Sequence, residues 1–349
     1  MILEMMPSQQ NLLLTGKHGI GKSEILTKYY EERGMKVVAL FLGQMSDSGD
    51  LIGLPHKNEV TGKTDFMPPY WFPVDGKPIV LFLDELNRAR PEVLQTIMDL
   101  ALNRKLAGRE LPEGSVLISA VNEGDEYQLT DLDPALVSRF NIVNFKPSVE
   151  EWLVWAEKQG LDTRVIQFIS NNNIYLDGDT THRAGSDTGL DKTPDRRAWE
   201  KVSQAILGCG ELMSIHKKLI GAMVGANAAN EFFKFAASKH MVGAKEVLAN
   251  FSKAKPAIEK YELHQMALVN EAIFRTLEGS ISKLDDKKKQ TVAKNLQDYV
   301  LWLSQTNRKE VLANFTSIFE KQTYPNALGF ILTKAPAIYN LLTQFVEEL

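Results

Sequence analysis

The stretch Gly16-Lys17-His18-Gly19-Ile20-Gly21-Lys22-Ser23 decides how the rest of the chain is interpreted. Its spacing fits G-x-x-x-x-G-K-[ST], the loop whose backbone N–H groups surround the phosphates of a nucleotide. The apolar run Leu12-Leu13-Leu14 before it predicts a strand buried on both faces, and a helix is expected from Lys22 to Tyr30. A helix N-terminus adds partial positive charge at the same point. The stretch therefore predicts a nucleotide-binding site.

Two side chains of this loop carry specific chemistry. Lys22 brings a full positive charge to the phosphates, and the Ser23 hydroxyl is a ligand type that suits Mg²⁺. We therefore expect ATP and Mg²⁺ as cofactors. The predicted nucleotide-binding residues are Gly16, Gly19, Ile20, Gly21, Lys22, Ser23 and Glu24.

Length and composition set the broad class. A chain of 349 residues exceeds the usual size of one core, which predicts two or three domains. A hydrophobic share of 44% with 24% charged residues is typical of a soluble globular protein, and a net charge of −4 gives no sign of a dominant nucleic-acid surface. The single cysteine, Cys209, excludes an intramolecular disulfide. We expect a cytoplasmic protein without a membrane span or secretory signal.

Further apolar runs predict the rest of a sheet. Residues 36–42, 79–83 and 116–121 are interpreted as three more buried strands, and helices are expected between them. Turn residues at Thr61-Gly62-Lys63 and Ala107-Gly108 indicate two small hairpins. Four strands alternating with helices predict a parallel sheet with helices on both faces, where ligands lie at the carboxyl ends of the strands.

Polar side chains occupy those predicted strand ends. Asp84 and Glu85 follow the run 79–83, and Asn122 follows 116–121. Asp84 is placed to hold Mg²⁺ together with Ser23, and Glu85 to act as the general base for water attacking the γ-phosphate. Asn122 is placed to orient that water. Because parallel strands end at one edge, all three are expected to face one phosphate.

Arg139 closes the run Asp133-Pro134-Ala135-Leu136-Val137-Ser138-Arg139-Phe140, which predicts a short helix. This helix is expected to point away from the chain's own nucleotide. A guanidinium in that position suits an arginine finger for a neighbouring subunit.

From Glu150 onward the pattern becomes helical. We expect helices at 151–159 and 163–170, another from Pro194, further helices up to about residue 240, and three or four more between 257 and 349. Residues 171–191 are rich in Asn, Asp, Gly and Thr and predict a mobile loop.

The order of these motifs resembles the AAA+ ATPases of the MoxR type, over residues 10 to about 240. The resemblance rests on the glycine loop, Leu83-Asp84-Glu85-Leu86-Asn87-Arg88-Ala89, Ala120-Val121-Asn122, Asp133 to Phe140, and Pro194 to Glu200. It implies an α/β P-loop NTPase (AAA+) core with a parallel sheet at 1–149, an all-α lid at 150–245 and a C-terminal helical extension at 246–349. It also implies that a lid arginine contacts the γ-phosphate, with Arg197 favoured and Arg196 open.

The resemblance further implies a homo-oligomer, a hexameric ring that works as a chaperone-like motor on a partner protein, often one with a von Willebrand A domain. Residues 53–70 are similar to the family's insertion in helix 2, and 104–113 to its hairpin before the strand that carries Asn122. Both inserts line or cap the central pore in such rings.

Other functions are compatible with the glycine loop alone. A nucleic-acid motor similar to McrB shares the insertion, and Arg104, Lys105 and Arg109 are candidate phosphate contacts. Against it, the net charge is negative and aromatic residues do not alternate with basic ones. A small-molecule kinase has no use for a finger in trans, and a non-catalytic scaffold does not need Glu85.

Overall fold

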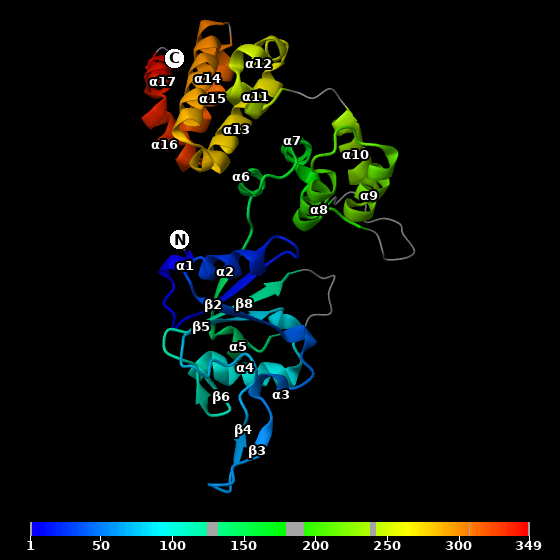
Figure 1. Cartoon of the computed structure of the whole chain (residues 1–349), viewed down its shortest axis with the longest axis vertical. Coiled ribbons are helices and arrows are strands. Elements are labelled where there is room, and N and C mark those ends of the chain that lie inside the picture. Colours follow the sequence, from blue (N-terminus) through cyan, green and yellow to red (C-terminus); the bar gives the residue numbers. More distant parts are fainter. Residues whose placement is uncertain (1, 124–131, 179–191, 238–241, 307, 348–349) are drawn as a thin grey trace. The chain divides into compact units, whose positions relative to one another are not determined.

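The computed structural model describes residues 2–123, 132–178, 192–237, 242–306 and 308–347. The chain divides into two compact units, Met1–Lys146 and Pro147–Leu349 (Figure 1). Among the described residues, no helix combines the length and the apolar character needed to cross a lipid bilayer.

The first unit is built on a five-stranded parallel sheet with the order β2-β5-β8-β1-β9. The strands are β1 Asn11–Gly16, β2 Lys36–Phe41, β5 Ile79–Asp84, β8 Val116–Asn122 and β9 Phe140–Asn144. Two hairpins stand apart from it, β3 Pro55–Lys57 with β4 Thr64–Phe66 and β6 Lys105–Leu106 with β7 Arg109–Glu110. The helices are α1 Ile2–Met5, α2 Lys22–Glu31, η1 Leu42–Gln44, α3 Gly49–Ile52, η2 Leu86–Arg88, α4 Pro91–Asn103 and α5 Pro134–Val137.

Alternate residues of the central strands pack into opposite layers, as strand geometry requires. Leu12 and Leu14 of β1 pack in one buried cluster with Leu26 of α2. Leu13 faces the other way, into a cluster that contains Val93 of α4. Helices α2 and α4 lie on opposite sides of the sheet (Figure 1). The predicted α/β fold with helices on both faces is therefore confirmed.

The edges of the sheet differ from the prediction. Strand β2 is an edge strand in which Leu40 alone is buried, so its interpretation as a buried strand was wrong. Strand β9 forms the opposite edge and was not predicted, because Asn141 and Asn144 interrupt the apolar run that marks a buried strand. The two predicted hairpins are confirmed.

The second unit is helical, and its buried side chains form two clusters. The first contains Trp152, Phe168, Trp199 and Phe232. It is formed by α6 Val149–Gln159, α7 Thr163–Asn171, η3 Asn173–Tyr175, α8 Arg196–Ile206, α9 Ser214–Val224 and α10 Ala226–Ala237. The second runs from Ala244 to Leu342 and is formed by α11 Ala244–Ala249, α12 Phe251–Ile258, α13 Leu263–Ser280, η5 Ile281–Lys283, α14 Asp286–Gln305, α15 Lys309–Glu320, α16 Pro325–Lys334 and α17 Pro336–Glu347.

The predicted helical character of this half is confirmed, but three or four helices after residue 257 were too few. Pro336 opens a separate helix, since proline suits the first turn of a helix. Of the predicted mobile loop, residues 173–175 form a short 3-10 helix, while 179–191 lie outside the described residues.

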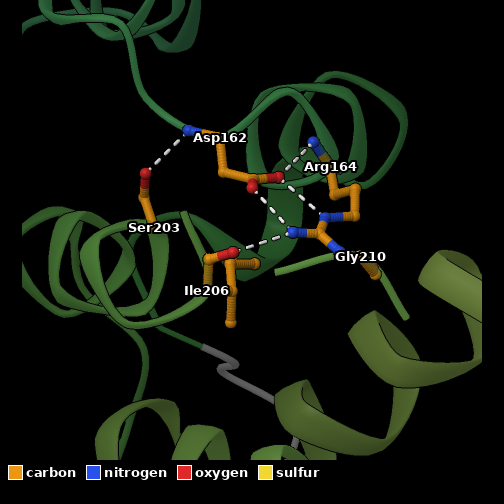
Figure 2. A network of polar contacts seen from close by, with 5 residues as sticks. All are labelled: Asp162, Arg164, Ser203, Ile206 and Gly210. Carbon is orange, nitrogen blue, oxygen red and sulfur yellow. Dashed lines mark hydrogen bonds and ion pairs between the residues drawn. The ribbon is translucent and has the colours of Figure 1, made fainter. Parts of the chain in front are cut away.

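A buried ion pair joins α7 to the end of α8 (Figure 2). Asp162 caps α7 by accepting from the Arg164 N–H, and its carboxylate oxygens accept from Arg164 Nε at 2.9 Å and Nη2 at 2.8 Å. The guanidinium also donates to the carbonyls of Ile206 and Gly210. Ser203 Oγ in turn accepts from the Asp162 N–H at 2.7 Å. Each charge of this pair is thus matched locally, which offsets the cost of burying it.

Candidate nucleotide site

The glycine loop follows β1 directly and requires unusual backbone angles. Gly16, Gly19 and Gly21 have φ values of 153°, 75° and 94°. A Cβ on Gly16 would lie 2.5 Å from the Phe145 carbonyl oxygen, so no other residue fits there without a shift. Gly21 adopts the left-handed conformation immediately before α2. The loop therefore turns sharply into the N-terminus of α2, as an anion-binding loop must.

Lys22 lies at the centre of the site and is only 6% exposed. Its Nζ donates to the carbonyl oxygens of Gly16 and Lys17, both at 2.8 Å, and to Asn122 Oδ1 at 2.9 Å. The contact with Asn122 joins the start of α2 to the end of β8, the strand that pairs with β1. The ammonium group is thereby held over the carboxyl edge of the sheet.

The proposed metal ligands are also in contact. Ser23 Oγ donates to Asp84 Oδ2 at 3.0 Å. Burial raises the pKa of Asp84 above its usual value, while the hydrogen bonds from Ser23 and from the Glu85 N–H act in the opposite direction. A carboxylate that is costly to ionise without a partner is suited to a cation, because the cation restores the lost solvation. The hydroxyl and carboxylate oxygens are the ligand types that Mg²⁺ prefers.

Glu85 has a strained backbone, with φ 56° and ψ 44°. The left-handed region costs a residue with a Cβ about 1–2 kcal/mol, and such strain is concentrated at functional sites. The turn lets the Glu85 N–H donate to Asp84 Oδ1 at 3.0 Å and directs the side chain to Arg88. Arg88 Nη1 lies 3.2 Å from Glu85 Oε1. The carboxylate is thus held in one orientation, next in sequence to Asp84.

Sequence reasoning missed two residues that position this site. Asn87 is buried, and its Nδ2 donates to the Asn122 carbonyl oxygen at 3.0 Å, which links the end of β5 to the end of β8. Arg88 orients Glu85, as described above. Both belong to the run 83–89 that carries part of the family resemblance. No periodicity or spacing within that run distinguishes a residue that positions the site.

Three arginines are candidates for contacts from a neighbouring subunit or from the predicted lid. Arg139 follows α5 and has an exposed side chain. In the second unit, Arg196 is 6% exposed and pairs with Asp177 at 2.8 Å, whereas Arg197 is exposed. Of the two lid candidates, Arg197 is therefore the side chain that is accessible to a ligand. The catalytic roles of these residues remain predictions.

The chain is similar to one protein family and to individual known proteins. The AAA domain family, dynein-related subfamily, matches residues 11–140. Among curated proteins, the putative chaperone BssE of Thauera aromatica is 30% identical over 162 residues, which cover 43% of this chain and 56% of that protein. Among solved structures, a putative ATPase from Cytophaga hutchinsonii matches with 17% identity and a TM-score of 0.33 over 44% of this chain and 47% of that one. The chain thus spans about half the length of these relatives.

The family match starts at the first residue of β1 and ends at the first residue of β9. It therefore covers the glycine loop, Asp84, Glu85, Asn122 and Arg139, and the sheet order and the contacts at its edge agree with it. Residues 11–140 of this chain are therefore similar to the AAA domain family, dynein-related subfamily, in both sequence and sheet order.

Proposed function

We propose that the chain is a Mg²⁺-dependent ATPase of the MoxR type that works in an oligomeric ring to remodel a partner protein. The observation that carries the proposal is the pair of contacts at the sheet edge, Lys22 to Asn122 and Ser23 to Asp84. They bring the phosphate-binding loop, a metal ligand and a water-orienting amide to one point. This is the set that phosphoryl transfer to water requires.

Each residue has a role in this mechanism. Lys22 neutralises charge on the phosphates, and Asn122 orients the attacking water. Glu85 would accept the proton of that water, since its carboxylate lies one residue beyond Asp84, which would hold the metal. Ser23 and Asp84 would hold Mg²⁺, which supplies positive charge to the phosphate oxygens. Arg139 of a neighbouring subunit and Arg197 of the lid would complete the site.

Protein, rather than nucleic acid, is the proposed substrate. Around the hairpin β3–β4, Leu54, Met67 and Tyr70 are 71%, 56% and 91% exposed. Exposed apolar side chains of this kind favour contact with protein. The similarity to a putative chaperone supports the same choice, and the MoxR resemblance favours a partner with a von Willebrand A domain.

The cations of the other hairpin are less suited to nucleic acid than the sequence indicates. Arg104 donates to the Ser8 carbonyl at 2.9 Å, and burial lowers its pKa. Lys105 pairs with Glu110 at 2.7 Å. A phosphate-binding surface needs cations that are exposed and uncompensated. The alternative of a nucleic-acid motor therefore loses two of its three candidate contacts.

The test of hydrolysis replaces Glu85 with Gln, which keeps the side chain's size and removes the base. ATP binding should stay within a few-fold of wild type, and turnover should fall by about 10²- to 10⁴-fold. Lys22→Ala is the matched control, because it should lose ATP binding itself. Radiolabelled ATP binding and phosphate release measure the two effects. A Glu85→Gln chain that hydrolyses ATP at the wild-type rate would exclude the assigned base.

The choice between protein and nucleic acid is tested by stimulation of the ATPase. We expect single- and double-stranded DNA to leave the rate unchanged. Stimulation of several-fold by DNA, lost on changing Arg109 to Ala and weakened steeply by salt, would favour the nucleic-acid motor instead.

A further inference from the structure

A pocket of about 70 Å³ lies within the second unit, between α7 and α13, with the end of α10 and the start of α11 beside it. Its polar lining consists of Gln167, Ser170, Asn171 and Gln265, together with two arginines, Arg164 and Arg275. No acidic side chain belongs to the described residues that line it. The pocket is therefore positively charged in its lining and uses none of the residues assigned to ATP.

The two arginines differ in how their charge is matched. Arg164 is paired with the carboxylate of Asp162 through two hydrogen bonds and donates to two backbone carbonyls (Figure 2). Its charge is compensated by Asp162, the residue that caps α7. Arg164 therefore forms part of the wall of the pocket and is not left to bind an anion.

Arg275 has no such partner. It is 4% exposed, and its Nη2 donates to Ser170 Oγ at 2.8 Å, while its Nε is buried without a hydrogen-bond acceptor among the described residues. Three acids, Glu150, Glu157 and Glu271, act on this charge from a distance, but none forms an ion pair with Arg275 among the described residues. Glu157 pairs with Lys245 at 3.0 Å, and Glu271 accepts from the Tyr324 hydroxyl. Burial lowers the pKa of Arg275, which is the effect expected of a cation with incomplete compensation.

A buried charge without an ion-pair partner is costly, so a cation whose charge is compensated only from a distance is an unusual feature for a folded protein to retain. Water can supply a hydrogen bond to Nε but no negative charge. A guanidinium presents a planar fork of donors that matches carboxylate and phosphate oxygens. At about 10–15 Å³ for each water-sized position, the pocket holds a handful of heavy atoms, which is the size of one phosphate or one short carboxylate.

We propose that this pocket binds a small oxyanion, a phosphate or a short carboxylate, with Arg275 as its charge partner and Ser170 and Gln167 as further hydrogen-bonding groups. The site joins α7, which belongs to the buried cluster of Trp199, to α13, which belongs to the cluster of Phe274. A bound anion would therefore contact both groups of helices in this unit and stabilise their packing against each other.

The test uses the full-length chain with Lys22→Ala, because the glycine loop would otherwise bind phosphate as well. Inorganic phosphate and acetate are titrated separately by calorimetry and by thermal unfolding, with sodium chloride at equal ionic strength as the control. We expect saturable binding of at least one of the two anions and a higher unfolding temperature, neither of which chloride reproduces. The anion that binds identifies which chemistry the pocket prefers.

Substitutions then locate the binding. Adding Arg275→Gln should weaken the affinity for the anion at least about ten-fold. Arg308→Gln, in the same unit but outside the pocket, should leave this affinity unchanged. Ser170→Ala keeps the guanidinium and removes one hydroxyl, so it should lower the affinity for the anion a few-fold. It provides a second test if Arg275→Gln does not fold. No saturable response to either anion, or equal binding with and without Arg275, would overturn the proposal.

Discussion

Two buried cations in this chain, Lys22 and Arg275, differ in how fully their N–H groups are hydrogen-bonded. Lys22 and Arg275 are 6% and 4% exposed. Lys22 donates to three oxygens, two of them carbonyls of its own loop, whereas Arg275 has Ser170 as an acceptor and an Nε with none. The first cation is matched by the local backbone before any ligand arrives. The Nε of Arg275 gains a hydrogen-bond acceptor only if a ligand enters the pocket beside it.

This difference follows from how each site is built. The acceptors of Lys22 come from residues five and six positions away and from the neighbouring strand. Ser170 lies 105 residues from Arg275. A site made by one loop has a sequence pattern, and a site made by packing two distant helices has none.

The largest expected effect concerns a third cation, Arg139, which is exposed and unlike either of the buried ones. If Arg139 acts on the nucleotide of a neighbouring subunit, Arg139→Ala should bind ATP normally and lose about 10³-fold or more in turnover. Specific activity of the wild type should also rise with protein concentration. Steady-state phosphate release measured over a dilution series checks both.

Mixing separates a finger in trans from a structural arginine. Rings containing Arg139→Ala and Lys22→Ala chains have interfaces at which an intact site meets an intact finger. Activity should partly return there, although each variant alone is inactive. Mixed rings that form and stay inactive at every ratio would show that Arg139 does not act across an interface.

The next largest effect compares a buried and an exposed aromatic side chain that are adjacent in sequence. Trp71 is 2% exposed and Tyr70 is 91% exposed. Trp71→Ala should destabilise the first unit by about 3–5 kcal/mol, the usual cost of removing a large buried aromatic side chain. Tyr70→Ala should change stability by less than about 0.5 kcal/mol. Urea unfolding measures both, and a comparable loss for Tyr70 would mean that this residue packs against the domain.

The two buried cations themselves should respond with opposite signs to the same replacement. Lys22→Met leaves three acceptors without their donor, so we expect a loss of about 1–3 kcal/mol in nucleotide-free protein. Arg275→Met replaces an uncompensated charge by an apolar chain of similar length, and should be neutral or stabilising by about 1 kcal/mol or more. Thermal unfolding without phosphate or acetate measures the pair. A large loss for Arg275→Met would show that its charge is already compensated.

The contrast between pattern and packing also explains which parts of the fold could be predicted. Strands β1, β5 and β8 are buried on both faces and appear in the sequence as continuous apolar runs. Strand β9 has one buried residue, Phe140, and offers no such run. The edge strand β2 has the apolar run but not the burial, because no strand in the described part of the chain pairs with its outer side. Sequence therefore indicates the centre of a parallel sheet better than its edges.

The candidate site shows the same limit. That Lys22, Asp84 and Asn122 lie together could be predicted, because strand ends of a parallel sheet share one edge. Which of Arg196 and Arg197 is exposed could not be predicted, since burial of Arg196 accompanies an ion pair with Asp177, 19 residues away. The Arg275 pocket was not predicted either, because each of its residues alone is an ordinary helical side chain.

The smallest expected effect concerns Asp84, whose pKa is raised mainly by burial. A folded-state pKa above the unfolded one stabilises the protein fully below the unfolded pKa of about 4, and this contribution is lost as pH rises through the folded value. Ionised Asp84 therefore costs stability at neutral pH. Asp84→Asn should raise the unfolding temperature of ligand-free protein by a few degrees at most at pH 7.5, and the gain should shrink toward pH 4.

The same variant should be less stabilised than the wild type by Mg²⁺ and ATP. Mg²⁺ with ATP should raise the unfolding temperature of the wild type more than that of Asp84→Asn, because only the carboxylate attracts the cation. Asn is the matched replacement, since it keeps the shape and the acceptor for the Ser23 hydroxyl. Equal stability of both proteins between pH 5 and 8 would mean that burial of Asp84 is already compensated. In that case Asp84 would resemble Lys22, and Arg275 would be the one costly charge among the three.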